Sequence, residues 1–163
     1  MRIGIALLGA LLAAPSLAAA QEAAKLNQVG LEAGIVSVGL SYARRVGDGP
    51  VSVGAGVWGS WEPAGSFDRN VWEPVVLGLF GRYHPTPWLH ADVGVLGGRY
   101  VNADDCSDCS GSLVGLRSDL FVGHRLLSIG PWATLAHASD DRNGGEVGVL
   151  WGVQLRSIIG WDG

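Results

Sequence analysis

The stretch EVGVLWGVQLRSIIGW, residues 146–161, shows the pattern that decides the fold. Apolar side chains recur at every second position, and glycine or polar side chains stand between them. A period of two is typical of a β-strand whose two faces meet different surroundings. One face carries Val147, Val149, Trp151, Val153, Leu155, Ile159 and Trp161, and the other carries Glu146, Gly148, Gly152, Gln154, Arg156 and Gly160. The alternation is broken at Leu150, Ser157 and Ile158.

The same alternation runs through the rest of the chain in segments of about ten residues separated by turn residues. The strands that it predicts are 27–33, 35–45, 51–61, 71–83, 88–100, 112–124, 127–138 and 146–160. Short turns alternate with long polar loops, which is typical of an outer-membrane barrel with both termini at one end. We therefore predict an all-β fold, an eight-stranded antiparallel up-and-down transmembrane β-barrel. The first hairpin has the weakest turn signal, Gly34 alone.

Alternation by itself does not say which face is outside. A soluble barrel such as a lipocalin would turn its valines inward and its polar residues to water. The polar face here is mostly Gly and Ser with a few charges, which suits the narrow, side-chain-filled interior of an eight-stranded barrel. The charged residues expected to neutralise one another in that interior are Glu32, Arg82, Asp92, Arg117, Asp119 and Arg156.

The composition also indicates a surface that does not face water. Charged residues make up 16% of the chain, compared with a typical ~25%, and Lys25 is the only lysine. A soluble domain with so few long charged side chains would not easily cover its surface. The formal net charge of −4 and the absence of a basic stripe argue against nucleic acid as a partner.

The N-terminus has the features of an export signal. Arg2 precedes an apolar run over 3–12, Pro15 interrupts it, and small residues end at Ala20. This order is typical of a cleaved secretory signal peptide, whereas a membrane anchor helix needs ~20 unbroken apolar residues. We predict a signal peptide over 1–20 and one outer-membrane β-barrel domain over 21–163.

The two cysteines, Cys106 and Cys109, lie in the predicted loop NADDCSDCSG. In an exported protein they predict a local disulfide, because the compartment is oxidising. A redox or zinc role is the alternative, but this loop offers no helix N-terminus, and two cysteines do not complete a four-ligand site. Acidic residues of the same loop could hold calcium, although their spacing fits no known loop template. We predict no metal and no cofactor.

Aromatic and proline positions bear on the barrel prediction in opposite ways. Several aromatic residues flank predicted turns and loops, as in interfacial girdles: Trp61, Trp72, Tyr83, Trp88 and Trp161. Pro74 and Pro131 fall inside predicted strands, where a closed barrel has no free edge for them. We expect each proline at a rim or a β-bulge.

Over its whole mature length the chain resembles the small outer-membrane β-barrel families of Gram-negative bacteria. The resemblance rests on the export sequence, the alternation, the loop asymmetry and the aromatic C-terminal strand. It implies location in the outer membrane, contact with its lipids including lipopolysaccharide, and a monomer. The fold hosts enzymes, pores and structural proteins alike, so it does not fix the function.

A local likeness concerns the lipid A 3-O-deacylases, in which a His-x-Ser motif ends the penultimate strand and a carboxylate follows near the start of the last one. His137, Ser139 and Glu146 occupy these places, with Asp140 where the family usually has Asn. The likeness implies an esterase in which Ser139 attacks an acyl ester, His137 takes its proton and Glu146 orients the imidazole. By parity, His137 and Ser139 point outward and Glu146 points into the lumen.

Two functions of different classes follow. The first is a small outer-membrane barrel with a structural or surface-exposed role and no open pore. The alternative is a lipid A 3-O-deacylase-like esterase that hydrolyses an acyl ester of lipopolysaccharide. In the non-catalytic interpretation, HASDD is the end of a strand that continues into an Asx-rich loop, where Ser and Asp stabilise turns. The sequence therefore does not decide whether the protein is an enzyme.

Overall fold

The structure is a computed structural model that describes residues 26–34, 37–60, 71–102, 110–140 and 144–162. In these residues no helix has the length and apolarity needed to cross a membrane. The predicted signal peptide over 1–20 lies outside the described residues.

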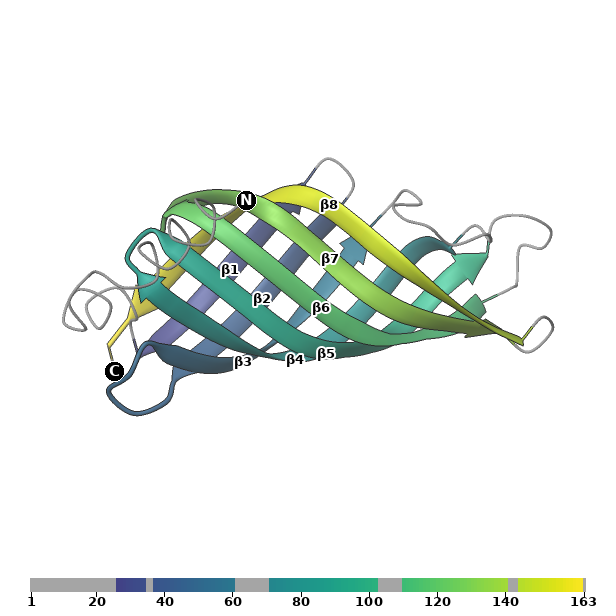
Figure 1. The fold of residues 1–163 in the computed structure, drawn as a ribbon, viewed down its shortest axis with the longest axis horizontal. Helices are drawn as coiled ribbons and strands as arrows, with labels where there is room; N and C mark the ends of the chain where they lie inside the picture. The colour runs from purple at the N-terminus through teal and green to yellow at the C-terminus, as the bar shows by residue number, and fades with distance from the viewer. Residues whose placement is uncertain (1–25, 35–36, 61–70, 103–109, 141–143, 163) are drawn as a thin grey trace, which may run out of the picture.

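Eight antiparallel strands form a closed barrel in up-and-down order, which confirms the predicted fold (Figure 1). Each strand pairs with the next one along the chain, and β1 pairs with β8 to close the sheet. The strands are β1 (Asn27–Gly34), β2 (Ser37–Arg45), β3 (Val51–Ser60), β4 (Val71–Thr86), β5 (Leu89–Asn102), β6 (Ser110–His124), β7 (Leu127–Asp140) and β8 (Gly144–Trp161). Closure leaves no unpaired edge.

The connections alternate between the two ends of the barrel. At the end that we call the turn end, β2 joins β3, β4 joins β5 and β6 joins β7, and both β1 and β8 have their outer ends there. The opposite end, called the loop end, receives the other four connections. The weakly signalled first hairpin is formed there, with Ala33 opposite Val38.

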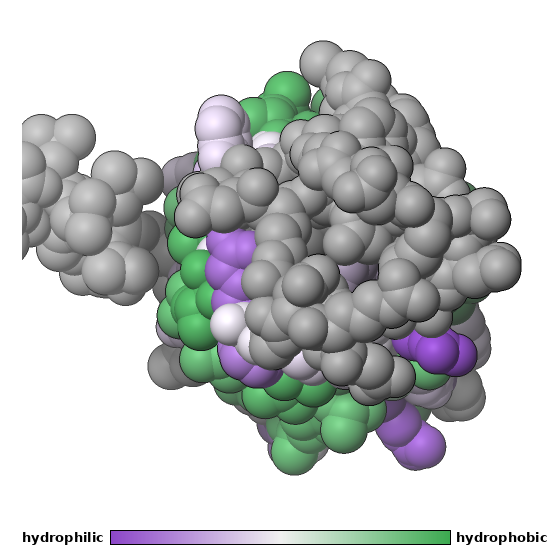
Figure 2. Space-filling view, turned by 90° about the vertical axis from the view of Figure 1, so that its right-hand side faces the viewer, coloured by the Kyte–Doolittle hydropathy of each residue, from purple (hydrophilic) through white to green (hydrophobic). Residues whose placement is uncertain are grey.

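The outer wall is apolar. Figure 2 shows hydrophobic side chains on the flanks of the barrel, and the exposed fractions of Leu77 and Leu79 reach 67% and 66%. Every strand from β1 to β8 contributes exposed large hydrophobic side chains to this surface. The predicted orientation is therefore correct: the valine and leucine faces point outward.

The lumen contains the opposite face of each strand. Its buried side chains include all six charged residues that the alternation predicts there. Aromatic rings and single apolar side chains fill the space between them, among them the two alternation-breaking residues Leu150 and Ile158. Alternation therefore fails at these positions because a narrow lumen also accepts apolar side chains.

Glycines on the lumen face make room for the large rings. A Cβ atom at Gly56 would lie 2.6 Å from the Trp58 ring, and one at Gly39 would contact the same ring. A Cβ atom at Gly111 would likewise contact the ring of Tyr100, and a Cβ atom at Gly152 would lie 2.9 Å from Nε1 of Trp132. The high glycine content, 26 of 163 residues, thus has a packing role.

The two prolines behave differently. Pro74 lies in a register shift between Trp72 and Val75, so the expected bulge is present. Pro131 lies inside β7, and the β6–β7 register is the same on both sides of it. No bulge is present at Pro131, which lies four residues from the turn-end start of β7, and there the ladder lacks the pairs between Asp119–Trp132 and Val122–Ile129. A proline removes one backbone donor, and the local gap in the ladder absorbs that loss.

Candidate functional sites in the lumen and on the outer wall

The centre of the lumen is organised around the carboxylate of Glu32, which is 2% exposed. Its Oε1 accepts hydrogen bonds from Nη2 and Nε of Arg156 at 2.7 and 3.0 Å. Its Oε2 accepts bonds from Nε1 of Trp58 at 2.8 Å and from Nε2 of Gln154 at 2.9 Å. One carboxylate from β1 therefore joins side chains of β3 and β8.

Two further acidic residues complete the ion-pair network. Asp92 accepts bonds from Nε and Nη2 of Arg82 at 3.0 and 2.9 Å, and Nη1 of Arg156 lies 2.9 Å from its Oδ2. Asp119 accepts bonds from Nη2 and Nε of Arg117 at 2.8 and 3.0 Å. Three arginines thus face three carboxylates, so the lumen network is neutral when all six are ionised. Pairing of this kind offsets the cost of burying a charge.

Aromatic rings cover the guanidinium groups of these arginines. Arg117 lies 4.8 Å from the ring centroid of Trp58 and 4.9 Å from that of Trp132. Arg156 lies 3.8 Å from the centroid of Phe121. Cation–π contacts add to the ion pairs and fix the planes of the guanidinium groups. The result is a closely packed plug across the lumen.

A histidine pair lies in the lumen near the turn end. Nδ1 of His84 is 2.7 Å from Nδ1 of His90, and Nε2 of His84 is 3.3 Å from Oε1 of Gln28. Alternation places His90 inward, but only the register across the β4–β5 turn brings His84 against it. The described residues contain no group of three or more His, Cys, Asp or Glu side chains able to hold a metal ion.

A small cavity of about 30 Å³, partly open to solvent, lies above the Trp58 ring toward the loop end. Its lining is mainly apolar, with Val76, Leu96, Leu113 and Leu150 around it. Arg117 also lines it, but the guanidinium is already engaged by Asp119. No catalytic set of side chains faces this space among the residues that line it.

The outer wall holds the predicted His-x-Ser pair at the loop end of β7. His137 is exposed and Ser139 is partly exposed, and both lie on the outward face of the barrel by parity. Oγ of Ser139 is 3.0 Å from Oγ of Ser112 on β6, not from the histidine. The imidazole leans toward β8, because a Cβ atom at Gly145 would lie 3.3 Å from its Nδ1. Within the described residues, His137 and Ser139 are neighbours without a mutual hydrogen bond.

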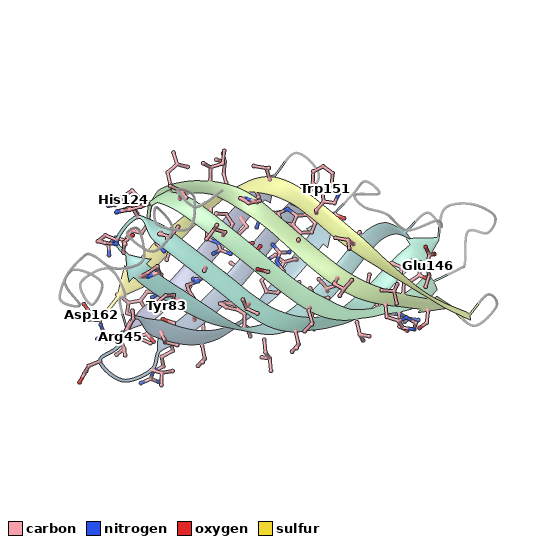
Figure 3. The ribbon with its side chains drawn as sticks, in the orientation of Figure 1. Arg45, Tyr83, His124, Glu146, Trp151 and Asp162 are labelled. Carbon is pink, nitrogen blue, oxygen red and sulfur yellow. The ribbon has the colours of Figure 1, made fainter. Side chains whose placement is uncertain are left out.

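Glu146 stands apart from this pair. It is opposite Ala138 in the β7–β8 ladder, whereas His137 is opposite Val147. Ala138 is buried in the lumen, so Glu146 and His137 lie on different faces of the sheet. Figure 3 places Glu146 near the loop end, far from Tyr83 and His124 at the turn end. The structure thus brings two of the three predicted site residues together and not the third.

The remaining predicted sites lie outside the described residues. This applies to the predicted disulfide, Cys106 and Cys109, and to the acidic residues between them and Asn102. Comparison with known proteins gives no relative, since no family model, curated protein or solved structure matches the chain.

Proposed function

We propose that the protein is a small integral outer-membrane β-barrel with a structural or surface-exposed role and no open pore. The observation that carries this proposal is the inverted distribution of side chains: a largely apolar outer wall around a lumen of buried ion pairs. A barrel in water would expose this large apolar surface at a high free-energy cost. A bilayer removes that cost, so the wall fits a hydrocarbon environment.

Aromatic side chains at the turn end support the same placement. Tyr42, Tyr83, Trp88 and Trp161 are all 43–46% exposed there. The Tyr42 hydroxyl donates to Oδ1 of Asn27 at 2.8 Å, as expected for a ring with an apolar body and a polar tip. Such rings belong at the interface between hydrocarbon and water. Of the other predicted girdle residues, Trp61 lies outside the described residues.

The contents of the lumen support a closed barrel. The network around Glu32 joins side chains from β1, β3, β6 and β8, and the covering rings of Phe121 and Trp132 occupy the space beside it. An eight-stranded barrel encloses space that side chains can fill. We therefore propose that solutes do not pass through it. The proposal as a whole is tested by the cell fraction in which the mature chain is recovered.

A second candidate function is favoured by one specific observation, the outward position of His137 and Ser139 at the loop end of β7. In the outer membrane, this position would put both side chains beside the acyl chains and headgroups of the outer leaflet. Oγ of Ser139 would attack an ester carbonyl while His137 accepts its proton. The proton would pass to the departing hydroxyl of the lipid, and water would then release the fatty acid and restore Ser139.

This candidate needs two local changes. Ser139 must exchange its bond with Ser112 for one with His137, which requires a different rotamer of the Ser139 side chain. The imidazole also needs an orienting acceptor, which Glu146 does not provide from the other face. Hydrogen bonds of catalytic groups often form only with substrate bound.

Ser139→Ala is the prediction that separates the two functions. If the esterase hypothesis holds, the variant loses at least about a thousandfold of the ester-cleaving activity while remaining folded and inserted. The measurement is mass spectrometry of lipid A from Gram-negative cells that carry an empty vector, the wild type or the variant. Ser118→Ala, an exposed outward serine on β6, is the matched control and should leave activity unchanged. Lipid A that is identical in all strains despite correct insertion rejects the enzyme and leaves the structural role.

A further inference from the structure

Polar side chains of three adjacent strands form a row on the outer wall at the loop end. Arg99 of β5 is directly opposite Ser112 of β6, and Ser112 is directly opposite Ser139 of β7. Arg99 and Ser112 are exposed and Ser139 is partly exposed. We call these three residues the polar row. Because neighbouring strands are ~4.8 Å apart, its three Cα atoms span about 10 Å.

The wall below the polar row is apolar. Toward the turn end, the next outward residues with large side chains are Val95 on β5, Val114 on β6 and Leu135 on β7, which are 52–56% exposed. His137 lies between the row and Leu135. The row therefore lies on the loop-end side of the exposed apolar side chains that the structure describes on β5, β6 and β7.

The height of the polar row along the barrel axis matches the height expected for lipid headgroups. Ser139 is twelve residues along β7 from Leu127 at the turn end. Twelve residues rise about 40 Å along a strand, or about 30 Å along the axis of a barrel tilted by ~40°. The apolar band of outer-membrane barrels is ~25 Å tall, so the polar row comes at the outer interface.

From this arrangement we infer that the polar row binds a phosphate group of a phosphorylated glycolipid in the outer leaflet. Arg99 supplies the positive charge and N–H donors for the phosphate oxygens. The hydroxyl groups of Ser112 and Ser139, already 3.0 Å apart, donate to the remaining oxygens. The glycolipid's acyl chains then lie on Val114 and Leu135 directly below.

The inference rests on the proposed membrane location and extends it with a ligand. The polar row also makes the two ends of the outer wall different. The only other outward arginine in the described strands, Arg44, is at the turn end on β2. The two leaflets of the outer membrane also differ, because phosphorylated glycolipid lies in the outer leaflet. If His137 and Ser139 act as an esterase, Arg99 and Ser112 hold the headgroup of the substrate beside them.

The test is binding of defined lipids to the purified, detergent-solubilised barrel, followed by native mass spectrometry. The probes are diphosphoryl lipid A, its dephosphorylated form and phosphatidylglycerol. We expect the wild type to prefer diphosphoryl lipid A, and Arg99→Gln to weaken that binding about fivefold, as for one arginine near an anionic lipid surface. Arg44→Gln is the matched control and should bind as the wild type does.

Three results would overturn the inference. They are equal binding by Arg99→Gln and wild type, equal binding of the phosphorylated and dephosphorylated lipids, and an equal loss in the Arg44→Gln control. A fivefold loss for phosphatidylglycerol that matches the loss for lipid A also rejects a glycolipid site, since it indicates general attraction to anions. If the protein inserts correctly and any of these results is found, only the lipid-binding inference is rejected and the proposed function stands. If the chain does not reach the membrane, both the inference and the proposed function are rejected.

Discussion

Replacing Glu32 by alanine is expected to lower the free energy of unfolding by about 3–5 kcal/mol, the cost of breaking a buried ion pair by removing one partner. The carboxylate accepts four hydrogen bonds of 2.7–3.0 Å from Arg156, Trp58 and Gln154. Its loss leaves Arg156 with Asp92 as its only carboxylate partner among the ion pairs described, and Nε1 of Trp58 without an acceptor. A buried donor that loses its acceptor cannot be rescued by solvent in a packed lumen.

Urea unfolding of the barrel in lipid vesicles, followed by its electrophoretic mobility without heating, measures this effect. Asp48→Ala is the matched control, because Asp48 is an exposed carboxylate in the turn between β2 and β3. Its removal should change the free energy of unfolding by no more than about 0.5 kcal/mol. A similar small change for Glu32→Ala would show that the network does not stabilise the barrel.

Leu79→Arg is expected to destabilise the inserted barrel by about 2–4 kcal/mol, the cost of an arginine facing lipid near the bilayer midplane. Leu79 is 66% exposed on the outer wall of β4, four residues from the girdle residue Tyr83. Four residues along a tilted strand amount to about 10 Å of height, close to the middle of a ~25 Å apolar band. In water the same substitution would place a charge on an exposed surface and cost little.

Leu126→Arg supplies the comparison for this prediction. Leu126 is also exposed, at 57%, but it lies in the turn between β6 and β7. The turn variant should unfold within about 0.5 kcal/mol of the wild type in the same vesicles. Equal effects of the two arginines would contradict a lipid-facing wall at Leu79.

Much of the fold could be predicted because each strand has a period of two. The alternation in 146–161 placed Arg156 and Gln154 inside and Trp151 and Val153 outside, as the structure does. Leu150 and Ile158 do not follow the alternation, because a lumen filled by side chains also accepts apolar ones. Pro131 has no bulge because a closed ladder can lack two neighbouring pairs without shifting its register.

The arrangement of the sites could be predicted only in part. Parity placed His137 and Ser139 outward and Glu146 inward, but it does not give the register between strands. That register is set by turn geometry, and it decides that Ser139 meets Ser112 and that Arg99 stands beside both. The histidine pair His84–His90 was missed for the same reason, since its contact depends on how the β4–β5 turn closes.

Whether the apolar wall lies in the outer membrane is decided by where the mature chain is found in the cell. Cells that express the chain would be separated into soluble periplasm, inner membrane and outer membrane, and the membrane fractions would be extracted with urea. We expect the protein to be recovered with the outer membrane and to resist extraction. Recovery as a soluble periplasmic protein would contradict it, because the 66% exposed Leu79 and its neighbours would then face water.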